Sequence, residues 1–281
     1  MLQEFRVDNY KSLINVIFKP HELNLLIGLN NSGKTNLCQA LLFVMNSTSF
    51  SLDQCADRIA GLRTGITNYF FDKSTIDFHI RASVPYEEED LIFEYDLTIL
   101  SSPTTPILNA TLQVESEKLV VTGKDFDGTI LLGNIRGKVR LLHEEEYLKG
   151  NDSYVETTAP RDTTMLNRLY DFETNARANH FRHYLSSWQY YDLSHSALRS
   201  SGYNPTNTVF NSTLFPDGSN LAAVIYHLKT RNERSYRSFL KYIQKFDPSI
   251  DLINFSHLTN DVFIMFFKDT EGHSLPAINA S

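Results

Sequence analysis

The sequence predicts an α/β fold in which helices cover a mixed sheet. Stretches with alternating apolar residues, typical of strands, are interleaved along the 281 residues with stretches whose apolar residues recur at helical spacing. In addition, the apolar run Leu23–Ile27 is followed by a glycine-bounded turn and then, from Thr35, by a helix-like pattern. Because a strand followed directly by a helix is the building unit of sheets covered by helices, both observations favour the same class.

The composition narrows the possible functions. Hydrophobic residues make up 42% of the chain, enough for a sizeable core, and 26 basic against 33 acidic residues give a net charge of −7. Proteins that wrap nucleic acid are normally basic, so such a role would need a local basic patch. Cys38 and Cys55 form no disulfide framework or zinc pattern, and no apolar run approaches the roughly 18 residues of a membrane helix. We therefore expect a cytoplasmic globular protein without a membrane partner.

The first fifty residues predict three strands and one helix. Residues 2–7 and 14–18 form two expected strands joined by a polar turn at 9–12. Leu23–Ile27 is apolar apart from Asn24, as expected for a strand buried on both faces of a sheet. The helix is expected to end at the polar stretch 46–51, and its apolar positions are Leu37, Ala40, Leu41, Val44 and Met45.

The rest of the chain is first strand-rich and then helical. Strands are expected at 75–84, 91–100, 112–114, 119–121 and 130–132, with Asp127-Gly128 as a turn signal. Helical spacing covers 161–187, 221–228 and 236–246, the last ended by Asp247-Pro248. A strand at Trp188–Leu193, a loop at 194–212 and two strands at 250–255 and 262–267 complete the prediction.

Residues 28–35 match the pattern G-x-x-x-x-G-K-[ST], which is the phosphate-binding P-loop. Its glycines allow backbone angles that a β-carbon would block, so that N–H groups converge on phosphate oxygens at the positive end of the following helix. Lys34 is expected to reach the β- and γ-phosphates of ATP, and the Thr35 hydroxyl to ligate Mg²⁺. The predicted nucleotide-binding residues are Gly28, Asn30, Asn31, Ser32, Gly33, Lys34, Thr35 and Asn36.

Residues 5–13 (FRVDNYKSL) and 25–37 (LLIGLNNSGKTNL) together resemble the opening of RecF-like ATPases. This group belongs to the SMC and ABC-type ATPase superfamily and is often described as an AAA-type ATPase domain. Asn31 departs from the glycine that is usual there, but asparagine tolerates left-handed backbone angles, so we expect the loop to form. The resemblance also places Lys11 near the nucleotide, whereas a solvated turn lysine is the alternative.

The resemblance implies a P-loop NTPase head of ABC type with a helical insertion. Residues 1–135 would form the P-loop lobe with antiparallel strands, 160–248 a mainly helical insertion, and 249–281 the start of a second lobe. A weaker similarity, to a bacterial subgroup of predicted ATPases, covers residues 188–193, 198–199 and 215–222. DNA is a possible partner through this resemblance alone.

The further motifs that the resemblance requires, a signature, a Walker B Asp-Glu pair and a switch histidine, do not occur in the 281 residues. Asp269 follows an apolar run, but Thr270 comes next and Glu271 precedes Gly272, as in a hairpin turn. We therefore expect a chain that is incomplete at its C-terminus and binds ATP without hydrolysing it alone. Its catalytic residues stay unassigned, and the missing groups would come from a C-terminal ATPase half or a homodimer partner.

Two other functions remain open. One is a non-catalytic regulatory or remnant subunit that pairs with a complete ATPase. The other is a P-loop kinase or GTPase, although the guanine-reading motif Asn-Lys-x-Asp is absent from the sequence.

Several single residues have both a functional and a structural interpretation. Gln189 could sense Mg²⁺ or lie at a strand edge, and Arg199 could contact nucleotide or DNA. His180 and His183 share a predicted helix without a further metal ligand. Cys38 is expected to be a small buried side chain, and Glu144–Glu146 a solvated face.

Overall fold

The computed structural model describes residues 1–60, 63–68, 73–104, 109–151, 153–169, 175–201, 213–258 and 263–277. The chain divides into two compact units, Met1–Trp188 and Gln189–Ser281, each of which is described by itself. The boundary at Trp188 falls inside the range 160–248 that the sequence analysis assigned to one insertion. The three-part division of the sequence analysis stays a prediction.

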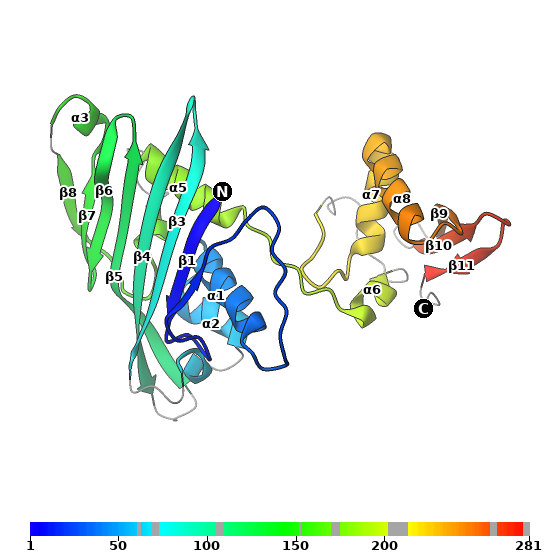
Figure 1. Ribbon diagram of the computed structural model, residues 1–281, viewed down its shortest axis with the longest axis horizontal. Helices are drawn as coiled ribbons and strands as arrows, with labels where there is room; N and C mark the ends of the chain where they lie inside the picture. The colour runs from blue at the N-terminus through cyan, green and yellow to red at the C-terminus, as the bar shows by residue number, and fades with distance from the viewer. Residues whose placement is uncertain are drawn as a thin grey trace. The chain divides into compact units, whose positions relative to one another are not determined.

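The first unit contains an eight-stranded sheet in the order β2-β1-β3-β4-β5-β6-β7-β8 (Figure 1). Every strand pair in it is antiparallel. The predicted mixed sheet is therefore wrong for the described residues, because strands that follow one another through short connections pair antiparallel. The run Leu23–Ile27, which was expected to be a buried strand, is not a strand. The strands are β1 (Leu2–Asp8), β2 (Val16–Phe18), β3 (Thr75–Tyr86), β4 (Glu89–Thr104), β5 (Asn109–Gly123), β6 (Phe126–Ile135), β7 (Lys138–Leu142) and β8 (Tyr154–Thr158).

Most predicted strands of this unit are confirmed, with differences in length. The expected strands at 112–114 and 119–121 are parts of the single strand β5. Asp127-Gly128, predicted to be a turn, lies inside β6, where Gly128 has a φ of 59°. The hairpin turn precedes β6 and lies between Gly123 and Phe126. Strands β7 and β8 were not predicted, because five-residue strands leave little alternation to detect.

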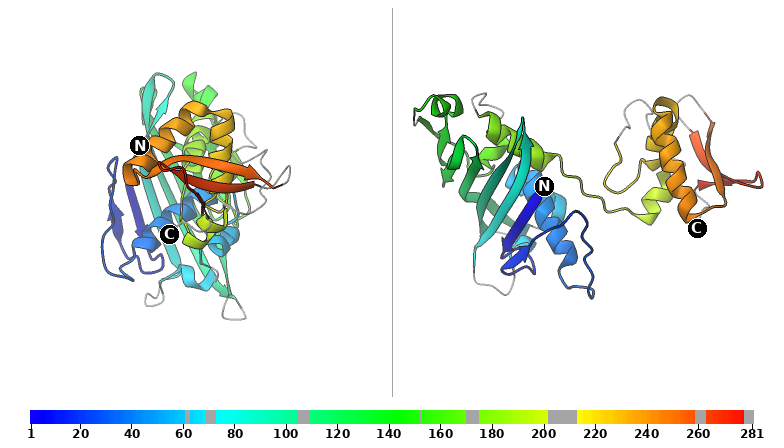
Figure 2. Two further views of the ribbon diagram at one scale, coloured as in Figure 1. Left: turned by 90° about the vertical axis from the view of Figure 1, so that its right-hand side faces the viewer. Right: turned by 45° about the horizontal axis from the view of Figure 1, so that its top comes forward.

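Helices cover one face of this sheet (Figure 2). Alternate residues of β3 are buried, as expected when one sheet face packs on a core and the other faces solvent. The aromatic side chains join helices to sheet, with Phe43 stacked on Phe78 at 5.6 Å and Phe181 on Phe93 at 5.0 Å between ring centroids. The helices are α1 (Lys34–Ser47), α2 (Leu52–Ala60), the 3₁₀ helix η1 (Arg63–Ile66), α3 (Glu144–Leu148), α4 (Met165–Arg168) and α5 (Ala176–Ser186).

A buried glutamate of the sheet, Glu117, holds the start of α4. Its carboxylate accepts hydrogen bonds from the backbone N–H groups of Met165 (2.6 Å) and Leu166 (2.9 Å) and from the Tyr95 hydroxyl (3.0 Å). Burial raises the pKa of Glu117 even though these donors act to lower it. In turn, the Thr164 hydroxyl donates to the Ser47 carbonyl at the end of α1 (2.8 Å). Glu117 thus anchors α4, and α4 anchors the C-terminal end of α1.

Glu144 corrects one expectation of the sequence analysis. It was predicted to belong to a solvated acidic face, but its side chain is buried and accepts hydrogen bonds from the backbone N–H of Arg177 (3.0 and 3.1 Å). The Arg177 guanidinium lies 3.3 Å from the same carboxylate. Because Arg177 lies in the first turn of the helix α5, Glu144 holds the start of that helix as Glu117 holds α4, whereas Glu145 is exposed as predicted.

The second unit combines helices with a three-stranded antiparallel sheet in the order β11-β10-β9. Its elements are α6 (His195–Ser201), α7 (Leu221–Arg231), α8 (Glu233–Phe246), β9 (Ile250–His257), β10 (Phe263–Asp269) and β11 (Ser274–Pro276). The predicted helices and the last two strands are confirmed, while Val262 and residues 202–212 lie outside the described residues. The predicted strand Trp188–Leu193 is wrong, since Asp192 bonds through its backbone N–H to the Pro216 carbonyl of a loop (2.8 Å).

Candidate functional site

The segment that precedes the predicted P-loop differs most from expectation. Residues 19–29 form no strand, and the side chains of Leu23, Leu25 and Ile27 are 89%, 80% and 84% exposed. Leu29, inside the loop, is 85% exposed as well. An apolar strand is stable only when neighbouring strands take its backbone hydrogen bonds, and among the described strands none pairs with this segment. The predicted buried strand is therefore wrong for the described residues.

The loop itself has the backbone that the motif predicts. Gly33 has a φ of 92° and Asn31 a φ of 65°, both in the left-handed region. The expectation that Asn31 would accept the conformation of a usual glycine is thereby confirmed. The Ser32 N–H donates to the Leu29 carbonyl at 3.3 Å, which closes the turn. The helix α1 begins immediately afterwards, at Lys34.

The Lys34 ammonium lies inside the loop. Its Nζ donates to the carbonyl oxygens of Gly28 (2.8 Å) and Leu29 (2.7 Å) and lies 3.2 Å from the Ser32 hydroxyl. Residues Asn30 to Asn36 line a hollow of about 320 Å³ beside it. Within the described chain no side chain caps the start of α1, and its first turn has no acidic residue. First-turn N–H groups and a lysine at one open hollow form an arrangement that suits an anion.

The turn at residues 9–15 contacts the first turns of α1, the helix that follows the P-loop. The Asn36 side-chain amide donates to the Ser12 hydroxyl at 2.7 Å. The Lys11 Nζ donates to the Gln39 side chain of α1 at 2.6 Å, and burial lowers the pKa of Lys11. Lys11 therefore lies against the first turns of α1, and its predicted approach to a nucleotide stays a prediction.

Aromatic packing fixes α1 below this turn. The Tyr10 ring meets the Phe43 ring of α1 edge to face at 6.2 Å and the Phe78 ring of β3 at 5.8 Å. All three side chains are buried. Tyr10 lies in the stretch 5–13 that resembles RecF-like ATPases, and its ring belongs to the core that holds the helix of the loop.

The other candidates of the first unit have structural partners. Cys38, expected to be buried, is half-buried, whereas Cys55 is buried and burial raises its pKa to about 12. His180 has its Nε2 2.7 Å from the Pro85 carbonyl and its ring against Tyr86. In the part of the chain that the structure describes, no group of three or more His, Cys, Asp or Glu side chains could hold a metal ion.

The candidates of the second unit also have structural surroundings. The Gln189 side chain accepts a hydrogen bond from the Tyr191 hydroxyl at 2.6 Å. Arg199 lies in the helix α6 rather than in the expected loop. The Asp269 carboxylate accepts from the N–H groups of Glu271 (2.9 Å) and His273 (2.8 Å), so it closes the turn before β11. The interpretation of this segment as a hairpin turn is confirmed.

A larger hollow, of about 430 Å³, lies against the solvent face of strands β1 to β4. Its carboxylates are already paired, Asp8 and Asp77 with Lys73 and Asp96 with His79. Asn30 to Asn36, which line the smaller hollow, are absent from its lining. The smaller hollow at the start of α1 is therefore the better candidate for ligand binding.

Comparison with known proteins identifies a family for this chain. A family model described as an AAA ATPase domain matches residues 1–265. A search of curated proteins finds no match. Among the helices described, none is long and apolar enough to cross a membrane.

Proposed function

Since the chain belongs to the AAA ATPase domain family, which is related to the RecF/SMC-like ATPases, we propose that its P-loop binds Mg-ATP. Membership of the family implies nucleotide binding, and one observation at the loop supports the assignment. The Lys34 ammonium lies between loop carbonyls at a hollow of about 320 Å³, where α1 begins without a side-chain cap within the described chain. This arrangement suits a chain of phosphate groups.

Each predicted residue has a role in this proposal. The backbone N–H groups from Asn30 to Asn36 surround the phosphates, and Gly28 and Gly33 keep the loop free of β-carbons. Lys34 exchanges the carbonyls of Gly28 and Leu29 for phosphate oxygens. Thr35, exposed at the start of α1, offers a hydroxyl oxygen of the kind that Mg²⁺ accepts. The metal, when bound, neutralises charge on the phosphates.

Binding is proposed without hydrolysis by the isolated chain. Hydrolysis needs a carboxylate that orients water, and the Asp269 carboxylate, at the end of the strand β10, is engaged in a turn. A complementary ATPase half or a second copy of the chain would supply the missing groups. The exposed residues Leu23, Leu25 and Ile27 beside the loop support such a partner, because they leave apolar surface to be covered. A regulatory subunit that pairs with a complete ATPase is the alternative, and the cytoplasmic location stays a prediction.

The binding step can be tested by titration. We expect purified protein to bind Mg-ATP, and Lys34→Ala to weaken binding by at least tenfold, because it removes the cation inside the loop. Lys124→Ala removes an exposed lysine of the turn between β5 and β6 and serves as the matched control. Absence of nucleotide binding by the wild-type protein, with its fold intact by circular dichroism, would contradict the proposal.

The second step is tested by phosphate release. We expect the wild-type chain to release no more phosphate from ATP than Lys34→Ala does. Steady turnover that Lys34→Ala abolishes would show that the chain hydrolyses ATP by itself, and the second half of the proposal would then be abandoned.

A second candidate function, contact with DNA, is favoured by the charge of α8. Its residues, Glu233–Phe246, include four basic residues and one acidic residue, a formal charge of +3 in a chain of −7. Arg234, Lys241 and Lys245 are exposed and recur at helical spacing on one side of α8. The side chains that α8 turns into the core are Tyr236, Phe239 and Ile243, which fall on its other side. Because that apolar face is already packed, the exposed face offers charge rather than an apolar anchor.

Two exposed aromatic residues follow lysines of this basic stripe, Tyr242 after Lys241 and Phe246 after Lys245. Tyr242 is 61% exposed and Phe246 is 92% exposed, and both lie on the same helix. Cationic side chains bind backbone phosphates, and exposed rings stack on unpaired bases, so the surface suits single-stranded DNA. Arg237 adds less, since its guanidinium lies 2.6 Å from the Glu233 carboxylate.

Salt dependence tests this candidate. With about three phosphate contacts, the slope of log K against log salt should be about −2 for a single strand. Replacing Lys241 and Lys245 by alanine should reduce the slope by about 1.4, whereas the control pair Lys124→Ala and Lys138→Ala should leave it unchanged. Equal losses from both pairs would refute a specific role of α8, and tighter binding to anionic vesicles than to DNA would assign the stripe to lipid.

A further inference from the structure

The turn that supports the P-loop has an unusual backbone. Asn9, Lys11 and Asn15 have φ angles of 59°, 50° and 50°, all in the left-handed region. Residues other than glycine adopt such angles at a cost, and they persist where the surroundings determine them. Hydrogen bonds within the turn, between Tyr10 and Leu13, and contacts to residues outside it together hold this shape.

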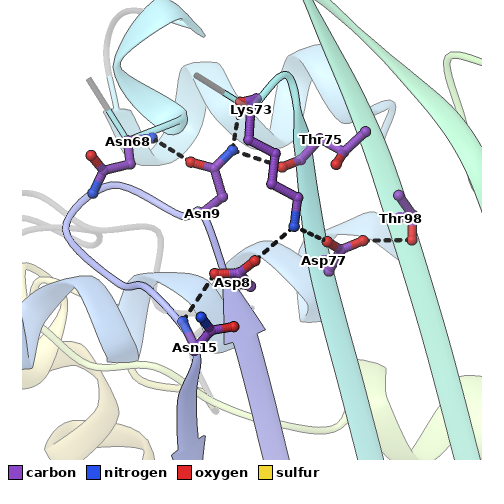
Figure 3. Close-up of polar contacts among 8 residues, drawn as sticks. All are labelled: Asp8, Asn9, Asn15, Asn68, Lys73, Thr75, Asp77 and Thr98. Carbon is purple, nitrogen blue, oxygen red and sulfur yellow. Dashed lines mark hydrogen bonds and ion pairs between the residues drawn. The ribbon is translucent and has the colours of Figure 1, made fainter. Parts of the chain in front are cut away.

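The first of these contacts is made by Asn9, whose side chain is fully buried. Figure 3 shows its amide group between two segments of the chain. The side-chain nitrogen donates to the carbonyl oxygens of Lys73 and Thr75, both at 2.7 Å, and the side-chain oxygen accepts from the Asn68 N–H at 3.2 Å. One amide therefore joins the turn to the start of β3 and to the segment before it.

A charged group closes the other end of the turn (Figure 3). Asp8 accepts from the Asn15 N–H at 2.9 Å and pairs with Lys73 at 2.7 Å, and Lys73 also pairs with Asp77 at 2.6 Å. Burial acts to raise the pKa of Asp8, but Lys73 and the Asn15 N–H outweigh it and hold this pKa below its ordinary value. The turn is thus fixed at Asn9 by an amide and at Asn15 by a carboxylate.

The turn in its fixed shape presses against the P-loop. A β-carbon placed on Gly33 would lie 3.2 Å from the Ser12 hydroxyl oxygen and 3.3 Å from a Leu13 methyl carbon. The backbone of Gly33 thus lies directly on the turn, and Asn36 donates to the Ser12 hydroxyl at 2.7 Å. Ser12 is therefore in contact with both Gly33 and Asn36, which lie on either side of the first residues of α1.

We propose that Asn9 is a positioning residue for nucleotide binding, which acts through Ser12 on Gly33 and Asn36. This inference rests on the proposed function. Asn9 does not touch the hollow; it fixes the turn, and the turn fixes the loop in the shape that receives phosphates. Preorganisation of this kind increases the affinity for nucleotide, because the loop is already ordered before the nucleotide binds.

Nucleotide affinity of four variants tests the proposal. Asn9→Asp keeps the size and the tolerance for left-handed angles but replaces a donor by an acceptor that faces two carbonyls, and we expect about tenfold weaker binding of Mg-ATP. Ser12→Ala removes the acceptor for Asn36 and should also weaken binding, whereas Ser12→Thr keeps the hydroxyl and should restore it. Glu117→Gln is the stability control. It disturbs the same unit at the start of α4, and Glu117 makes no hydrogen bond to the P-loop or to the turn 9–15.

The outcomes separate the two claims. Wild-type binding that Lys34→Ala abolishes, with Asn9→Asp and Ser12→Ala both binding like wild type, would overturn the inference and leave the proposed function intact. The same holds if Glu117→Gln, at a matched loss of melting temperature, weakens binding as much as Asn9→Asp does. A wild-type chain that binds no nucleotide would overturn both.

Discussion

The two segments that flank the P-loop are both rich in apolar residues, but one is buried and the other is exposed. Downstream, α1 buries Ala40, Phe43 and Val44 completely in the core of the first unit. Upstream, Leu23, Leu25 and Ile27 are at least 80% exposed. Both flanks were predicted to be buried elements of one sheet and its covering helix.

The difference reflects how helices and strands satisfy their backbones. A helix pairs its N–H and C=O groups within itself, so α1 needs only an apolar surface, which β1 and β3 supply through Phe5 and Phe78. A central strand needs a hydrogen-bonded neighbour as well, and among the described strands none lies beside residues 23–29. The local sequence pattern is therefore sufficient to predict the helix α1 but insufficient to predict a strand at residues 23–27.

The largest expected effect tests the downstream flank. Phe43→Ala should destabilise the first unit by about 3–5 kcal/mol, because it removes a buried ring stacked on Phe78. Leu25→Ala, at the upstream flank, should change the free energy of unfolding by no more than about 0.5 kcal/mol. Denaturant unfolding measures both, and similar costs at the two positions would show that the upstream flank is packed in solution.

A smaller effect is expected where α4 secures the end of α1. Glu117→Gln places an amide NH₂ against backbone N–H donors and should cost about 1–3 kcal/mol.

The pH dependence gives a second measure at Glu117. Because burial raises its pKa above the ordinary 4.5, its contribution to stability is complete below that pH and is lost as the pH rises through the raised value. Glu117→Gln should remove this decline from the stability curve. A decline of equal size in the variant would assign it to another group, such as Glu144, whose pKa burial also raises.

The last prediction compares the rates of backbone amide hydrogen exchange in the two flanks and requires no substitution. In hydrogen exchange, backbone amides of residues 24–29 should exchange almost as in an unfolded chain, while those of residues 38–44 in α1 should be at least about 10³-fold slower. Protection of residues 24–29 that appears only with a partner or with nucleotide would identify what orders the upstream flank. Strong protection in the isolated chain would contradict the described exposure.

Features set by neighbouring residues could be predicted from the sequence. The P-loop turn, the left-handed Asn31 and a helix from Thr35, which in the structure begins at Lys34, were all predicted, because glycine, asparagine and helical spacing act locally. The alternating strands β3 and β4 were predicted for the same reason.

Features set by distant residues could not be predicted. Glu144 is buried because Arg177, 33 positions later, meets it, and nothing in the run Glu144–Glu146 indicates this. The role of Asn9 depends on carbonyl groups more than sixty positions away. Its sequence signal, an asparagine before Tyr10 and Lys11 in a turn, indicated a left-handed angle at best.

The exposed segment also bears on how the chain behaves at high concentration. Residues 23–29 read Leu-Asn-Leu-Leu-Ile-Gly-Leu, with no charge and no proline. Short apolar windows of this kind, free to pair edge to edge with identical copies, are the sequences from which aggregation starts. Residues 19–29 directly follow β2, the edge strand of the sheet, so they lie next to unpaired backbone groups with which another copy can pair. We therefore expect the yield of soluble protein to increase when a partner covers this segment.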